Sequence, residues 1–359
     1  MKKILALSLI LLALGSFVFA DDAKVMPMMV GRVYVAPTFS FAPGGYDTDG
    51  KYHSYDDTVK LFNLGFALEY GVINWITAAI QWAPGWTPWS DVKGAAGPLG
   101  NYSEDLNTNG VADLFVGAKV QIVGEKAPVQ TSQFRAAIAP GIIIPLPGPD
   151  FEDELSDVMA GKKATVSSMD RHVFAAGARL YFDWIINEHF YLNLYNETLF
   201  YPVKQDLNKD SPTFAGIKAN PTTGGAFNSI DGKVNYKYRL TFEIEPVFTT
   251  SIADGISFTA GLPVNYRYIP TYDYSFSYGA LAGTGLDIAA KKAFNDNLNT
   301  DPQHSLSLKP NVLLFFTKTP LPLEFKLQYG LPIWGQNSMA RHDITLQIRV
   351  YFALPGRPE

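Results

Sequence analysis

The sequence predicts an all-β protein, a transmembrane antiparallel β-barrel of about twelve strands with short periplasmic turns and long extracellular loops. Three observations support this class. Apolar and polar residues alternate with a period of two, the connections alternate between short and long, and the composition combines few charges with many aromatic residues. Strands with one face in lipid and the other toward a polar lumen produce all three.

The period-two alternation is clearest toward the C-terminal end. From Leu323 to Leu331 the odd positions are apolar, and the even positions hold Glu, Lys, Gln and Gly. Successive side chains of a strand point to opposite faces, so each such strand has one apolar and one polar face. Asn196 and Thr198 fall on the apolar parity of their segment, which indicates either a bulge there or a different register for this strand. The template predicts strands at 30–42, 58–71, 75–86, 111–123, 133–146, 172–185, 189–202, 234–248, 256–272, 304–317, 322–334 and 341–352.

The connections form two classes, as in bacterial outer-membrane barrels, where short turns face the periplasm and long loops face outward. An even number of strands then places both termini on the periplasmic side. Short connections are predicted at 74, 125–132, 186–188, 249–255 and 318–321. Long connections are predicted at 43–57, 87–110, 147–171, 203–233 and 273–303, with a shorter one near 335–340.

The composition indicates contact with lipid. Charged residues make up 18% of the chain and aromatic residues 14%, whereas a soluble domain usually has about 25% charged residues. The net charge of -5 argues against nucleic acid, because phosphate binding needs clustered positive charge. We therefore expect outer-membrane lipid and a small-molecule solute as partners, and no nucleic acid. The sequence leaves the oligomeric state open.

The first twenty residues have the features of an export signal. Lys2 and Lys3 precede the apolar stretch 4–14, and small or modest side chains follow at 18–20. We expect residues 1–20 to be a signal peptide and 21–359 to form a single barrel domain in the bacterial outer membrane. The chain has no cysteine, so hydrogen bonding and apolar burial must stabilise it without disulfides.

A soluble β-sandwich would also show alternation, because each of its sheets has a buried and an exposed face. It would not explain the regular change between short and long connections. The nearly uninterrupted apolar parity, with the charges on the other parity, also favours the barrel.

The polar parity identifies the side chains expected to line the pore. The predicted pore-lining residues are Glu69, Lys119, Arg135, Arg179, Asp183, Glu197, Lys237, Arg239, Glu243, Glu245, Arg267, Lys309, Glu324, Lys326 and Arg349. Their mixed signs do not match a pore selective for one sign of ion, which needs rings of like charge. Most of them should lie in the periplasmic half, where we expect a lattice of salt bridges that narrows the lumen.

Apolar side chains interrupt the polar parity above this predicted lattice. These residues are Phe115, Ile143, Tyr195, Leu313 and Phe315. They either fill the interior, as small barrels require, or form an amphipathic pocket with Arg239, Arg267 and Lys237 near its outer opening.

Motifs for catalysis or metal binding are weak. The segment 105–113 has oxygen ligands at alternate positions but lacks the glutamate that completes a calcium loop, and its Asn and Gly also suit a turn. The histidines have no metal-binding spacing, and the sequence contains no Gly-x-Ser-x-Gly motif. We expect no catalytic residues, no metal and no cofactor, and hence no enzyme. Helix-like spacing at 150–154 and 286–298 predicts helices in two loops.

Two stretches, 109–122 and 134–148, resemble outer-membrane channel proteins associated with the phenol meta-cleavage pathway. In that family a Gly-x-Gly-Asp strand is followed by a hairpin partner that ends in a Pro-Thr-Gly-like turn. This chain departs from the pattern at 111–112 and 146–147. The resemblance implies a barrel that admits aromatic or other small apolar compounds. The long-chain fatty-acid transporters are related in function, but only a short segment separates Asp21 from the first strand, which predicts no N-terminal plug of their kind.

These observations favour an outer-membrane channel or transporter that admits small molecules, including apolar or aromatic ones, through a narrow lumen of mixed charge. Two alternatives stay open. A general diffusion porin would have an open, hydrated lumen, and a structural or adhesin-like barrel would use the loops at 203–233 and 273–303 to bind a partner.

Overall fold

The computed structural model describes residues 22–91, 96–97, 100–101, 110–146, 173–206, 231–271, 273–277, 282–283, 285 and 301–353. Within these ranges there is no helix long and apolar enough to cross a membrane. The expected signal peptide, the two expected loop helices and most of the candidate calcium loop lie outside the described residues.

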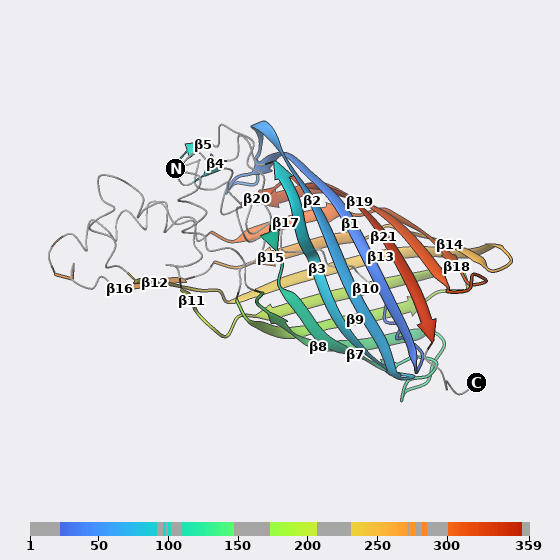
Figure 1. Cartoon of the computed structure of the whole chain (residues 1–359). Coiled ribbons are helices and arrows are strands. Elements are labelled where there is room, and N and C mark those ends of the chain that lie inside the picture. Colours follow the sequence, from blue (N-terminus) through green and yellow to red (C-terminus); the bar gives the residue numbers. More distant parts are fainter. Residues whose placement is uncertain are drawn as a thin grey trace.

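Twelve antiparallel wall strands close into a barrel, because the first strand pairs with both the second and the last (Figure 1). The undivided wall strands are β1 (Val30–Tyr46), β2 (Tyr52–Ile73), β3 (Ile76–Asp91), β8 (Phe134–Ile144), β9 (Ala175–Ile185), β10 (Phe190–Phe200), β13 (Tyr238–Ala253), β19 (Leu323–Gln336) and β21 (His342–Ala353). Three wall strands consist of two pieces each, namely β6 (Gly110–Val111) with β7 (Leu114–Val123), β14 (Ile256–Gly261) with β15 (Val264–Ile269), and β17 (Gln303–Leu308) with β18 (Asn311–Phe316).

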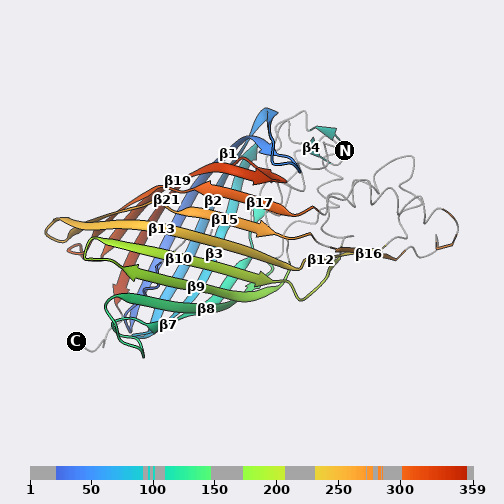
Figure 2. The same ribbon diagram turned by 180° about the vertical axis from the view of Figure 1, so that it is seen from behind.

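The remaining strands lie at the long-loop end. There β11 (Gln205–Asp206), β12 (Asp231–Asn235) and β16 (Asp273–Ser277) form a small sheet beyond the barrel wall (Figure 2). Strand β20 (Ser338–Met339) pairs with the end of β1, and β4 (Ala96–Gly97) pairs with β5 (Gly100–Asn101).

The two faces of the wall differ as the alternation predicts. Leu68 is 45% exposed while its neighbour Glu69 is 6% exposed, and Leu327 is 50% exposed beside Lys326 at 6%. The exposed residues are apolar and the buried ones are charged, the reverse of a water-soluble protein. No second sheet covers the apolar face of the described barrel strands, which excludes the sandwich. The apolar outer face is the one that lipid would cover.

Prolines divide two neighbouring wall strands. Pro263 separates β14 from β15, and Pro310 separates β17 from β18. Proline has no N–H to donate to a ladder, so it is unfavourable within a sheet. Each carbonyl is still used, since Pro263 O accepts from Lys309 N at 2.8 Å and Pro310 O accepts from Tyr329 N at 3.0 Å. The wall therefore stays hydrogen-bonded across both breaks, and Lys309 lies in the break between β17 and β18.

The predicted closed barrel of twelve antiparallel strands is confirmed. The long connection predicted at 43–57 is wrong, because β1 extends to Tyr46 and β2 begins at Tyr52, which leaves only residues 47–51 between them. The bulge expected at Asn196 and Thr198 is wrong, because β10 runs in unbroken register with both neighbours. The side chains of Asn196 and Thr198 instead form hydrogen bonds with each other and with the backbone of β13. Thr198 Oγ1 donates to Asn196 Oδ1 (3.2 Å), and Asn196 Nδ2 donates to the carbonyl of Thr241 (3.1 Å).

Candidate functional site: the barrel lumen

A chain of buried polar side chains begins on one side of the lumen. Glu197 in β10, 2% exposed, accepts hydrogen bonds from Arg179 Nε at 2.7 Å and Arg239 Nη2 at 3.1 Å. Arg179 Nη1 also donates to Gln81 Oε1 (2.5 Å), and Gln81 Nε2 donates to Glu69 Oε1 (3.2 Å). Both arginines thus have a carboxylate partner where an unpaired charge would be strongly destabilising.

The same chain continues across the first and last strands. Glu69 Oε2 accepts from Arg32 Nε (3.0 Å), and Arg32 Nη1 donates to the Tyr351 hydroxyl (3.3 Å). That hydroxyl donates to Glu324 Oε2 (2.9 Å), and Glu324 Oε1 accepts from Arg349 Nη1 (2.6 Å). We call this set the arginine–glutamate chain; its members are Arg239, Glu197, Arg179, Gln81, Glu69, Arg32, Tyr351, Glu324 and Arg349.

In a second group of lumenal side chains, next to the arginine–glutamate chain, amides rather than cations hold the carboxylates. Asn193 and Asn311 donate from Nδ2 to the two oxygens of Glu245, at 3.0 and 2.9 Å. Asn265 Nδ2 donates to Glu243 Oε2 at 2.8 Å. These five residues, from β10, β13, β15 and β18, form the amide–carboxylate group.

Two lysines lie near this group without a close carboxylate partner. Lys326 is 6% exposed and Lys309 is half-buried. The ion pairs of the described residues include neither of them, although both act on Glu243 over a longer distance. The lumen therefore holds paired charges in the arginine–glutamate chain, and two lysines without a close carboxylate partner near the amide–carboxylate group.

Residues 22–28 lie inside the lumen at its short-turn end. The backbone N–H of Ala23 donates to both oxygens of Asp183, at 3.0 and 3.1 Å, and Gln121 Nε2 donates to the carbonyl of Ala23 at 2.9 Å. Lys119 Nζ donates to the carbonyl of Asp22 at 2.9 Å. Ala23 is fully buried.

Further along, the segment binds the hairpin between β2 and β3. Met26 N donates to Thr77 Oγ1 (2.7 Å), and Met28 N donates to Asn74 Oδ1 (3.1 Å). The short segment before β1 was not expected to enter the lumen, although it is not a long plug of the kind that the fatty-acid transporters have. An extended chain covers about 3.3 Å per residue, so even seven residues can cross much of a narrow lumen.

A cavity of about 290 Å³ lies beside this segment in the short-turn half. Lys326 and Glu245 contribute polar groups, while Leu313 and Phe315 contribute apolar ones. The sequence placed these two apolar residues above the charged lattice. That position is wrong, because β18 ends at the short turn that leads to β19. Phe115 and Tyr195 are buried in the wall, and the guanidinium carbon of Arg179 lies 3.8 Å from the Phe115 ring centre.

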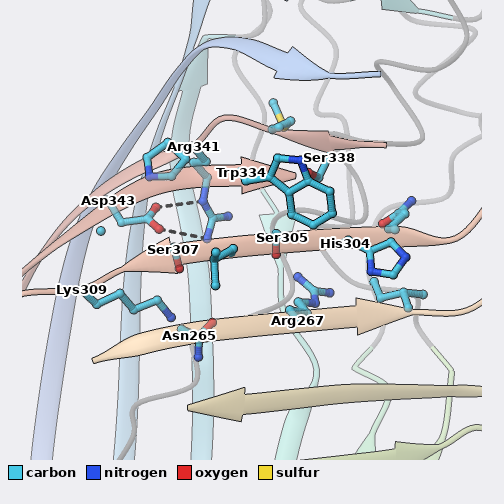
Figure 3. A pocket seen from close by; sticks show the side chains of 16 residues that line it. Asn265, Arg267, His304, Ser305, Ser307, Lys309, Trp334, Ser338, Arg341 and Asp343 are labelled. Atoms are coloured by element: carbon cyan, nitrogen blue, oxygen red, sulfur yellow. Dashed lines mark hydrogen bonds and ion pairs between the residues drawn. The ribbon is translucent and has the colours of Figure 1, made fainter. Parts of the chain in front are cut away.

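A second cavity, of about 80 Å³, lies toward the long-loop end (Figure 3). Its charged lining groups are Arg267, Lys309, Arg341 and Asp343. Trp334, Pro332 and Ile269 supply apolar surface. Residues of both strand faces line this cavity, and the pairing of β17 with β19 shifts register between residues 306 and 307.

Most predicted pore-lining residues gather in these groups. The arginine–glutamate chain contains Glu69, Arg179, Glu197, Arg239, Glu324 and Arg349; the amide–carboxylate group contains Glu243 and Glu245. Lys119, Arg135 and Asp183 surround the N-terminal segment, and the cavities include Arg267, Lys309 and Lys326. Lys237 lies apart from them, exposed between strands and 3.4 Å from Asp273.

The sequence prediction of pore-lining residues omits the uncharged members of the arginine–glutamate chain and of the amide–carboxylate group, and one arginine. Arg32, Gln81, Asn193, Asn265 and Asn311 all lie on the inward parity of their strands, so the alternation alone could have identified them. The predicted pore-lining residues are all charged, and they do not include Arg32, which lies near the beginning of the first strand. No group of three or more His, Asp or Glu side chains arranged to hold a metal occurs among the described residues.

Comparisons with known proteins identify the class of fold. No family model and no curated protein matches the sequence. Among solved structures, the chain is similar to the COG4313 outer membrane channel from Pseudomonas putida F1, with a TM-score of 0.59 and 11% identity, over 93% of this chain and 100% of that one. This similarity, with the closed sheet and its apolar outer face, defines the fold as an outer-membrane-type β-barrel.

Other similarities are weaker. The β domain of the Bordetella autotransporter BrkA aligns with a TM-score of 0.40 and 10% identity, over 90% of this chain and 99% of that one. The NanC porin aligns with a TM-score of 0.37 and 10% identity, over 90% and 100% of the two chains.

Proposed function

We propose that the protein is a bacterial outer-membrane channel for small molecules, in which residues 1–20 are an export signal and 21–359 form the barrel. One observation carries the proposal: the polar lumen holds a cavity on each side of the amide–carboxylate group instead of a filled interior. A barrel with a purely structural role would have no need of such cavities. The similarity to a solved outer-membrane channel supports this proposal.

The N-terminal segment makes the channel narrow. Residues 22–28 occupy the short-turn end, and the arginine–glutamate chain lines the wall beside them. A general diffusion porin would have an open, hydrated lumen, so this arrangement favours selective passage of small solutes. The apolar groups Leu313 and Phe315 of the inner cavity support solutes with an apolar or aromatic part.

Conductance in planar bilayers tests this proposal. We expect the refolded chain that starts at residue 21 to give a small conductance, and a chain that starts at residue 29 to give a conductance several times larger, because the contacts of Ala23 and Met26 are removed. Both chains are refolded and purified in the same way. Equal, large conductances would contradict the occlusion. No conductance and no liposome swelling with sugars, aromatic compounds or fatty acids would contradict the channel and leave the structural barrel.

The expected processing has its own test. N-terminal sequencing of the protein recovered from outer membranes should begin at Asp21. Recovery of an unprocessed chain from the soluble fraction would contradict both the signal and the membrane location.

A further inference from the structure

The inner cavity, beside residues 22–28 in the short-turn half, has room for a small molecule. Its volume is about 290 Å³, against about 80 Å³ for the outer cavity at the long-loop end. Ligand pockets usually have volumes of about 300–1,000 Å³, so the inner cavity lies near the lower end of that range. The charges of its lining then decide which class of molecule it can hold.

Most charged groups of this lining already have a partner of opposite charge. The paired groups are Lys24 with Asp22 (2.8 Å), Arg349 with Glu324 (2.6 Å) and Arg32 with Glu69 (2.5 Å). Two charged lining residues, Lys326 and Glu245, form no ion pair with any residue that the structure describes. The inner cavity therefore contains one cation and one anion that are not neutralised by a close partner.

Lys326 is the more exposed to this imbalance, because nothing in the described part of the chain accepts its hydrogen bonds. The residue is only 6% exposed, so bulk water does little to solvate its ammonium group. An ammonium group has three N–H donors, and a buried charge without a partner is strongly unfavourable. A solute that brought an anionic acceptor to Lys326 would remove this cost.

Glu245 offers the opposite group. It is 5% exposed, and each of its oxygens accepts one amide hydrogen bond, from Asn193 at 3.0 Å and from Asn311 at 2.9 Å. A carboxylate can accept more than these two bonds. Asn193 also lines the cavity, and its Oδ1 has no hydrogen-bond partner among the described residues. Glu245 and Asn193 together therefore suit a cationic donor.

The two unpaired charges lie on either side of one strand. Asn311 and Leu313 are successive inward residues of β18, and Leu313 is directly opposite Lys326 on β19, while Asn311 contacts Glu245. Phe315, the next inward residue of β18, has its ring centre 5.3 Å from that of Tyr351. A molecule that reaches both charges would therefore also contact an apolar and aromatic surface.

We propose that the inner cavity binds an α-amino acid with an apolar side chain. Its ammonium group would donate to Glu245, its carboxylate would accept from Lys326, and its side chain would lie against Leu313 and Phe315. This proposal rests on the proposed channel function and specifies its solute class. Apolar walls with a few converging polar groups are the usual composition of a ligand site, and here both charges of the zwitterion find a partner.

Titration calorimetry of the chain that starts at residue 21, in detergent, tests the proposal with three ligands of similar size. L-Phenylalanine carries both charges, hydrocinnamate lacks the ammonium group, and phenethylamine lacks the carboxylate. We expect phenylalanine to bind, and each analogue to bind at least about tenfold more weakly. Tenfold corresponds to about 1.4 kcal/mol, near the lower end of what a hydrogen bond to a charged group contributes.

Two variants assign the charges of the ligand to the two residues. Lys326→Met should weaken binding of phenylalanine and hydrocinnamate at least about tenfold and leave phenethylamine unchanged. Glu245→Gln should weaken binding of phenylalanine and phenethylamine and leave hydrocinnamate unchanged. The matched controls are Lys318→Met and Glu188→Gln, which remove the same charges from exposed turns. Far-ultraviolet circular dichroism shows whether each variant keeps its strands.

The contrary outcomes are as clear. Equally tight binding of the three ligands by the wild-type protein would overturn the recognition of both charges, whether or not the variants fold. Unchanged phenylalanine binding in both folded lumenal variants would overturn the site. A wild-type protein that conducts but binds no phenylalanine would overturn this inference and leave the channel intact. Phenylalanine binding by a protein that never conducts would retain the site and overturn the channel.

Discussion

The two groups of polar side chains in the lumen use charge differently. In the arginine–glutamate chain, buried arginines pair with glutamates at hydrogen-bond distance, as in Arg179–Glu197 at 2.7 Å. In the amide–carboxylate group, asparagine amides hold the carboxylates, and the neighbouring Lys309 lies outside the ion pairs of the described residues. The planar guanidinium fits a carboxylate in a fixed geometry, whereas the lysine ammonium is a flexible point charge. The arginine–glutamate chain is therefore suited to support the wall.

The largest loss of stability should come from breaking the arginine–glutamate chain. Glu197→Gln removes the charge that neutralises both Arg179 and Arg239, and leaving buried charges uncompensated costs about 3–5 kcal/mol. The free energy of unfolding in urea, measured in lipid vesicles, should fall by that amount.

A matched control separates this effect from the loss of any carboxylate. Glu188→Gln changes the same group on a turn, where the side chain is 87% exposed. Its effect on the free energy of unfolding should be below about 1 kcal/mol, as for exposed pairs. Equal effects of the two substitutions on the free energy of unfolding would contradict a supporting role for the arginine–glutamate chain.

The geometry of the amide–carboxylate group depends on the space that Gly261 leaves beside it rather than on charge pairing. A Cβ at Gly261 would lie 2.2 Å from Glu245 Oε1 and 2.9 Å from Asn311 Nδ2. Gly261→Ala should therefore displace the Glu245 carboxylate and lower the free energy of unfolding by about 1–3 kcal/mol, the usual cost of overpacking. Gly65→Ala is the control, since its nearest atoms would lie at an ordinary 3.5 Å. A Gly261→Ala protein as stable as the Gly65→Ala protein would show that the amide–carboxylate group tolerates rearrangement.

The sequence predicts the wall much better than the lumen. Alternation is a property of each strand, so the segments 322–334 and 341–352 reveal their faces without any knowledge of their neighbours. The ion pairs join residues far apart in the chain, such as Arg32 and Glu69, and depend on strand register and on the curvature of the closed sheet. Parity can place Glu197 in the lumen, but it cannot show that Arg179 and Arg239 share it.

The N-terminal segment shows a different limit of sequence reasoning. Residues 22–28 have no alternation, and their place is set by backbone groups that bond to Asp183 and Thr77. Every amino acid except proline carries a backbone N–H, so the sequence holds no signal for such contacts. The outer cavity is similar in this respect, since residues of β15, β17 and β19 line it and these strands become neighbours only through their pairing in the sheet.

The smallest effect on stability should come from the exposed His53–Asp47 pair at the long-loop end. His53 Nε2 lies 2.6 Å from Asp47 Oδ2, and the same carboxylate accepts from the backbone N–H groups of Lys51 and Asp49. The hydrogen bond with His53 is the first cause that lowers the pKa of Asp47 below its ordinary value of 3.8. A lowered pKa means that the carboxylate stabilises the hairpin fully above pH 3.8, and that this contribution is lost as the pH falls through the lowered pKa. Amide hydrogen exchange at Lys51, corrected for the intrinsic rate, should therefore become faster only below that pH, and Asp47→Asn should remove the pH dependence without changing the global free energy of unfolding. A pH-dependent loss of the whole barrel in the same range would show instead that the buried carboxylates, and not this exposed one, respond first to acid.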